Sequence, residues 1–144
     1  MMKTASILHS LTAFLEAVRK DNKSLVICYA DRAGHTQLLW RETDAWLGSL
    51  DVAQNKAWTA IAFSGVTSDK GLTTEALSKL TQPGEPLYGL QNTNSGRVVI
   101  FGGGIPIYQD NKLVGSIGVS GSTVEDDIKY CKIAVDAYLE QEQS

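Results

Sequence analysis

The sequence predicts an α+β domain in which helices pack on the faces of one antiparallel sheet of five strands. The first observation behind this fold class is the periodicity of apolar residues, which gives the order helix, two strands, one or two helices, three strands, helix. The second is that turn residues join the strands locally as hairpins, so that only the middle helices bridge the two groups of strands. The 144 residues fit a single domain, residues 1–144.

The N-terminal segment is expected to form a helix followed by a hairpin. Apolar side chains recur at three- and four-residue spacing over residues 6–20, which is typical of an amphipathic helix. Residues 25–30 form a continuous apolar run, short enough for a central strand that is covered on both faces. The turn residues at 31–35 then lead into a second strand over residues 36–41.

The middle of the chain predicts two helices. Residues 50–63 carry a narrow face of small side chains, including Ala53, Ala57 and Ala60, which lets a helix lie flat on a sheet without leaving a void. Thr73 or Thr74 then caps a short helix that runs through residue 80.

Three further strands are expected before the last helix. Residues 97–101 restart as a strand after a loop rich in asparagine and glycine. Residues 105–108 and 113–119 face each other across the turn residues Asp110 and Asn111, which predicts a hairpin.

A capping signature opens the last helix. Ser122 is followed three residues later by Glu125, and Thr123 is followed likewise by Asp126. Apolar residues then recur at spacings of four and three as far as Tyr138, so one stripe of this helix is expected to face the core.

Composition and charge exclude several classes of function. The formal net charge of −3 supplies no cationic field for nucleic acid. No segment reaches the roughly 20 apolar residues of a membrane span, and the N-terminus lacks a secretory pattern, so we expect a cytoplasmic protein with no membrane contact. Cys28 and Cys131 are isolated and fit buried, reduced thiols better than a disulfide or a zinc site.

The most informative stretch of the chain is residues 101–121, a hairpin with the glycines Gly102, Gly103 and Gly104 at its mouth. Three consecutive residues without Cβ carry an entropic cost at the margin of a strand. The segment therefore predicts either positive φ angles or room for another backbone or a ligand.

Other motifs favour no catalytic chemistry. Glycines at 115, 118 and 121 suggest a phosphate loop, but the acidic residues 125–127 already occupy the following helix N-terminus and would repel an anion. Ser120 does not complete a nucleophile elbow, because the flanking spacing is wrong. The consecutive carboxylates at 125–127 point in different directions on a helix and form no metal cluster.

The two histidines and one tryptophan leave alternatives open. His9 is either a solvent-facing residue of the first helix or an axial metal ligand to a bound porphyrin, because neutral imidazole commonly ligates haem. His35 lies in a hairpin turn, where it supplies turn polarity. Trp46 is either a core residue or the anchor of a subunit contact.

Four segments in co-linear order carry a family resemblance: residues 29–35, 54–60, 83–90 and 101–121. They resemble the GlcG/HbpS-like haem-binding family, which includes the domain fused behind PduO-type corrinoid adenosyltransferases. The likeness spans roughly residues 24–138. The resemblance implies a profilin-like five-stranded antiparallel sheet flanked by helices, in agreement with the order of elements above.

The resemblance also implies a function. Family members are small binding modules that assemble into homo-oligomers and hold haem or handle related tetrapyrroles in corrinoid-dependent diol or glycerol metabolism. Lys56 would pair with a haem propionate and Thr59 would contact the ring or the metal. Carried over by position, the ligand-binding residues are Lys56, Thr59, Phe101, Gly102, Gly103 and Gly104. No catalytic residue set transfers.

Three hypotheses follow. The first is a cytoplasmic binding protein for a small-molecule ligand, with helix 50–63 and the glycine loop lining a pocket or an intersubunit cleft. The second is an enzyme that degrades or modifies a tetrapyrrole or a small metabolite. The third is a structural assembly subunit, whose glycines serve only close packing between chains.

Overall fold

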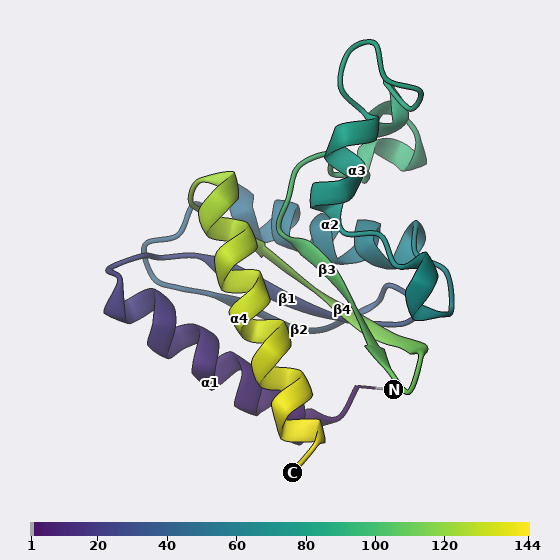
Figure 1. Cartoon of the computed structure of the whole chain (residues 1–144). Helices are drawn as coiled ribbons and strands as arrows, with labels where there is room; N and C mark the ends of the chain where they lie inside the picture. Colours follow the sequence, from purple (N-terminus) through teal and green to yellow (C-terminus); the bar gives the residue numbers. More distant parts are fainter. Residues whose placement is uncertain (1) are drawn as a thin grey trace.

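The computed structural model describes residues 2–144 and shows an α+β fold with helices on both faces of an antiparallel sheet. Figure 1 shows α1 and α4 side by side over the sheet, with α2 behind it. The elements in chain order are α1 (Thr4–Lys20), β1 (Val26–Asp31), β2 (Thr36–Arg41), α2 (Gly48–Ala62), η1 (Ser68–Lys70), α3 (Thr74–Leu80), η2 (Leu90–Asn92), η3 (Asn94–Gly96), β3 (Gly104–Gln109), β4 (Lys112–Ser120) and α4 (Val124–Glu142).

The sheet has four strands in the order β2-β1-β4-β3, so the prediction of five strands is wrong. Residues 97–101 do not pair as a strand. The N–H of Val99 donates instead to Thr59 Oγ1 of α2 at 3.1 Å, and both Val98 and Val99 are buried. The apolar residues of this run are buried, but the N–H of Val99 bonds to a helix side chain rather than to a neighbouring strand.

The two faces of β1 contact different helices. Ile27 and Tyr29 belong to the larger core, which α1 and α4 cover with aliphatic and aromatic side chains. Cys28 on the other face packs against Ala53 and Ala57 of α2. A Cβ at Gly118 would collide with the backbone of α2, so this helix lies almost directly on the sheet. The prediction that a face of small residues places this helix flat on the sheet is confirmed.

Local signals in the sequence are confirmed at the turns and helix caps. Asp110 and Asn111 both have positive φ, 50° and 62°, as the tight β3–β4 hairpin requires. The hydroxyls of Thr73 and Thr123 each accept a hydrogen bond from the main-chain N–H three residues later, and so cap α3 and α4.

The segment between α3 and β3 extends away from the sheet, as the teal and green ribbon at the top of Figure 1 shows. It contains only the short helices η2 and η3 and exposes the apolar side chains of Leu87 and Tyr88. Most of this arm has no cover from the rest of the chain.

Cys28 and Cys131 are buried free thiols, as predicted. Burial raises the pKa of both thiols, that of Cys28 to about 11. Within residues 2–144, no helix has the length and apolar character needed to cross a membrane.

Candidate ligand site

Lys56 forms a buried ion pair that joins the two faces of the sheet. Its side chain is fully buried in α2, and Nζ donates to a carboxylate oxygen of Asp127 at 2.9 Å and to the carbonyl oxygen of Val119 at 2.8 Å. The second carboxylate oxygen of Asp127 accepts the N–H of Ser122 at 3.0 Å. Because Asp127 lies in the first turn of α4, this pair connects α2 with α4 past the end of the sheet.

Burial dominates the electrostatics of this pair. Loss of hydration lowers the pKa of Lys56, while the charge and hydrogen bond of Asp127 oppose that shift. Loss of hydration likewise raises the pKa of Asp127 against the effect of Lys56. Each charged group therefore depends on the other, because a single charge left in this place would have no partner.

The three consecutive glycines make room for Lys56 and for α4. A Cβ at Gly103, where φ is 127°, would lie 2.6 Å from both Lys56 Nζ and the Val119 oxygen. A Cβ at Gly102 would lie 2.5 Å from Cδ1 of Ile128, and one at Gly104 would meet the main chain of Lys56. The positive φ and the close approach predicted for this segment are both present, and the neighbours are groups of the same chain.

Thr59 is buried one turn after Lys56. Its hydroxyl accepts the N–H of Val99 at 3.1 Å and donates to the carbonyl oxygen of Arg97 at 3.3 Å. The hydroxyl thus fixes the segment that leads into the glycines. Contact of Thr59 with a ligand stays a prediction, as does contact of Lys56 with a propionate.

The Lys56–Asp127 ion pair and the three glycines together form what we call the sealed junction. An apolar hollow of about 340 Å³ opens beside it. Trp46, Val52, Phe101 and Val124 form its apolar wall, and Ser120, Ser122 and Asp127 contribute polar atoms. Trp46 is 74% exposed and Phe101 is 41% exposed. The Phe101 ring lies 5.1 Å from Lys56 Nζ, so the buried cation stands behind the ring. We refer to this space as the Trp46–Phe101 hollow.

His9 lies apart from the hollow. It is exposed on α1, and the hydroxyl of the next residue, Ser10, donates to the carbonyl oxygen of Ala134 in α4. Ala134 follows Asp127 by seven residues, which is about 10 Å along a helix. The structure therefore brings Lys56 together with Phe101 and the three glycines, and Thr59 lies next to them, whereas His9 is not part of this group.

Sequence reasoning missed Asp127 as the partner of Lys56. The acidic residues 125–127 were interpreted only as a helix N-terminus, and the sequence carries no signal that one of them meets a lysine 71 positions earlier. In the part of the chain that the structure describes, no group of three or more His, Cys, Asp or Glu residues could hold a metal ion.

Comparison with known proteins adds independent findings. A model of the HbpS-like family, described as haem degrading protein HbpS-like, matches residues 3–136. An uncharacterised 15.0 kDa protein from the dhaT–dhaS intergenic region of Citrobacter freundii is 40% identical over 119 residues, which cover 83% of this chain and 79% of that protein. The crystal structure of a PduOC–haem complex has a TM-score of 0.86 at 34% identity and covers 94% of both chains.

A longer relative contains a similar segment. The corrinoid adenosyltransferase PduO of Salmonella typhimurium is 38% identical over 131 residues, or 90% of this chain. The match covers only 37% of that enzyme.

Proposed function

Because the chain belongs to the HbpS-like family, we propose that it is a cytoplasmic binding protein for haem or a related tetrapyrrole, and that the Trp46–Phe101 hollow takes the planar ring. The observation that carries this proposal is the exposure of two large aromatic side chains, Trp46 and Phe101, around one apolar hollow. Aromatic walls suit a flat, largely apolar ligand. The relatives in the dhaT–dhaS region and in PduO support a role in corrinoid-dependent diol or glycerol metabolism.

The residues around the hollow have distinct roles in this proposal. Phe101 and Trp46 would contact the ring, and Lys56 Nζ lies 5.1 Å from the centre of the Phe101 ring. A propionate would reach Lys56 only by displacing Asp127. In this proposal Lys56 therefore does not bind the ligand directly but supports the wall of the hollow behind Phe101. Haem supplies an iron that an imidazole can ligate.

His9 would supply that imidazole from a second copy of the chain. It lies on α1 and does not line the hollow, so in this proposal a ring held by Phe101 of one chain would take its imidazole from a neighbouring chain. The exposed apolar side chains of Leu87 and Tyr88 on the arm support assembly into a homo-oligomer. Native mass spectrometry of the purified protein should report more than one chain per particle, and a strictly monomeric protein would contradict this arrangement.

Haemin titration tests the proposal. The wild-type protein should give a saturable Soret band, which Phe101→Ala and Trp46→Ala weaken by removing the aromatic wall. His9→Ala should shift the band through loss of iron ligation. Leu80→Ala is the matched control, because Leu80 is exposed but lines neither the hollow nor another described cavity. Titration without saturation, or equal binding by all four variants, would refute the proposal.

Haem degradation is the second candidate, and the description of the matching family favours it. Incubation of the protein with haemin and a reductant, followed by absorbance against a heat-denatured control, separates the two functions. A binding protein should retain the haem spectrum. Turnover of many haem equivalents per chain would assign an enzyme instead.

A further inference from the structure

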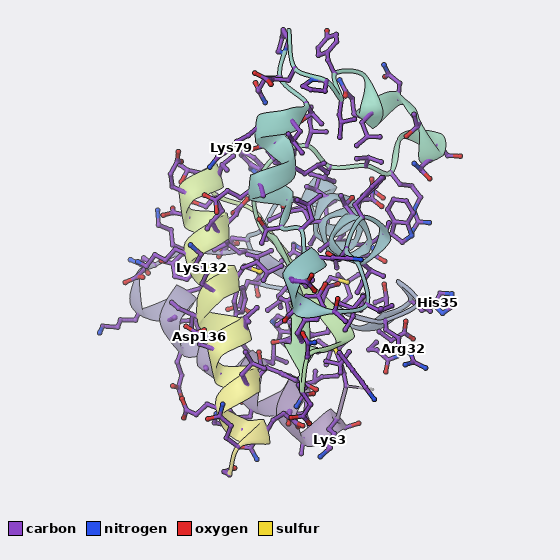
Figure 2. All side chains as sticks on the ribbon, turned by 45° about the vertical axis from the view of Figure 1, so that its right-hand side comes forward. Lys3, Arg32, His35, Lys79, Lys132 and Asp136 are labelled. Atoms are coloured by element: carbon purple, nitrogen blue, oxygen red, sulfur yellow. The ribbon has the colours of Figure 1, made fainter. Side chains whose placement is uncertain are left out.

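A second cavity, of about 610 Å³, lies at the hairpin end of the sheet. It is bounded by the β1–β2 turn, the loop after α2 and the start of β4, and we refer to it as the hairpin cavity. Its lining residues are Arg32, Ala33, Val66, Thr67, Lys112 and Leu113. Figure 2 shows Arg32 at the same edge of the molecule as His35, away from Lys132 and Asp136 on α4.

The walls of the hairpin cavity are fixed by contacts between distant segments. The N–H of Leu113 donates to the carbonyl oxygen of Val66 at 2.9 Å, and the N–H of Ser68 donates to Asn111 Oδ1 at 3.0 Å. On the other side, the β1–β2 turn packs on α2 so closely that a Cβ at Gly34 would lie 2.8 Å from Trp58. The cavity is therefore preformed, which lowers the ordering cost of binding.

The lining combines an apolar surface with two cations. Val66, at 77% exposed, has the most exposed of the large apolar side chains in the described residues, and Leu113 and Ala33 extend the apolar surface beside it. Arg32 and Lys112 form no ion pair within residues 2–144. This is notable in a protein whose net charge is −3.

The nearby carboxylates do not line the cavity. Asp31 accepts hydrogen bonds from the N–H groups of Ala33 and His35, and Asp69 accepts the hydroxyl of Thr67. Asp110 lies in the β3–β4 turn, two residues before Lys112, outside the lining. The cations at the rim thus lack an acidic partner, whereas the Trp46–Phe101 hollow has Asp127 in its wall.

The geometry points to a binding site for a small amphipathic carboxylate in the hairpin cavity. The anionic head lies between Arg32 and Lys112, and the hydrocarbon body covers Val66 and Leu113. Burial of the body stabilises the complex, and the two cations select the charge. Two cations around one concave space suit a single carboxylate rather than the extended backbone of a nucleic acid. The site is separate from the hollow and does not depend on the haem proposal.

Octanoate tests this inference, with octanol and octylammonium as probes of equal chain length. Titration of ¹⁵N-labelled protein should show saturable shifts at the amides of Ala33, Thr67 and Leu113, with tighter binding of octanoate than of either other probe. Arg32→Gln and Lys112→Gln should each weaken octanoate binding about three- to fivefold, as expected for exposed ion pairs. Val66→Glu should weaken it at least as much by adding a like charge at the rim.

Lys132→Gln is the matched control, because Lys132 is exposed on α4 and does not line the cavity. Octanoate affinity in this variant should equal that of the wild type. Equal affinity for octanol and octanoate, shifts confined to residues around Trp46 and Phe101, or unchanged affinity in Arg32→Gln and Lys112→Gln would each overturn the inference. Sedimentation with phosphatidylglycerol vesicles distinguishes a lipid surface from a free carboxylate, and co-sedimentation that Arg32→Gln abolishes would also overturn it.

Discussion

Lys56 and Lys112 show how differently two regions of this small domain treat a positive charge. Lys56 is sealed between α2 and α4, with a carboxylate and a carbonyl oxygen as partners. Lys112 lies at the rim of the hairpin cavity with no ion pair in the described chain. The first lysine holds the fold together, and the second is available to a ligand.

The two regions also differ in how visible they are in the sequence. The lysine and glycines of the sealed junction form the most recognisable pattern of the chain, and their contacts are internal. The hairpin cavity has no sequence pattern at all, because its residues come from three separate segments. A marked motif in a small domain can therefore report a demanding packing problem rather than a place where a ligand enters.

The largest effect is expected from Lys56→Met, which tests whether the junction depends on its ion pair. The substitution leaves the buried carboxylate of Asp127 without its cation. We expect a loss of about 3–5 kcal/mol in the free energy of unfolding, measured by urea denaturation. Lys132→Met, at an exposed position of α4, is the control and should change stability by less than about 0.5 kcal/mol.

The double variant Lys56→Met with Asp127→Leu sharpens this test. Removal of both charges eliminates the unpaired group, so much of the lost stability should return. If the double variant were as unstable as the sum of the single variants, the ion pair would not be the cause of the loss.

Gly103→Ala should have the next largest effect. The new Cβ would meet both Lys56 Nζ and the Val119 oxygen at a φ of 127°. Backbone strain and overpacking together should cost about 2–4 kcal/mol in thermal or urea unfolding.

Gly48→Ala is the matched glycine control. No atom lies within 4 Å of a Cβ at Gly48, which is the first residue of α2. We expect no loss of stability there, and a gain of up to about 1 kcal/mol from the lower entropy of the unfolded chain. Equal losses at both glycines would show that the junction is not especially tight.

Much of the fold was accessible from the sequence because it depends on local signals. The apolar periodicity of α1, the turn at Asp110 and Asn111 and the cap at Thr123 all act within a few residues. The fifth strand was predicted wrongly for the opposite reason. Residues 97–101 have strand-like composition, but the N–H of Val99 bonds to Thr59, 40 positions away.

The candidate site was predicted only in part. The glycine pattern predicted a close approach, and the family resemblance singled out Lys56. The structure places Lys56 and the glycines side by side. It did not reveal that Asp127 would be the partner, because a contact over 71 positions depends on how α4 packs on the sheet. The same limit hid the hairpin cavity, since Arg32 and Lys112 come to line one cavity only after the strands pair.

Glu42 is intermediate between the buried, paired Lys56 and the exposed Lys112, and it gives a pH-dependent test. Its carboxylate is buried but accepts hydrogen bonds from the exposed Arg19, at 2.7 Å and 3.2 Å, and from Trp40 Nε1 at 2.9 Å. The hydrogen bond from Arg19 is the main cause of the lowered pKa of Glu42. Because the folded state then binds a proton less readily than the unfolded state, this stabilisation exists above the ordinary pKa of 4.5 and is lost as the pH falls further.

Glu42→Gln should therefore reduce the free energy of unfolding by about 1 kcal/mol at pH 7, and the difference from wild type should shrink below about pH 4.5. Urea denaturation at a series of pH values measures it. A difference that stays constant down to pH 3 would mean that packing, rather than the charge of Glu42, accounts for the loss.

The smallest effect is expected at the hairpin cavity. Arg32→Gln and Lys112→Gln remove exposed charges that have no ion pair in the described residues, so each should change the free energy of unfolding by less than about 0.5 kcal/mol. Urea denaturation beside Lys56→Met makes the comparison direct. A loss above about 1 kcal/mol would place these cations among the structural charges, whereas unchanged stability leaves them free to act on a ligand.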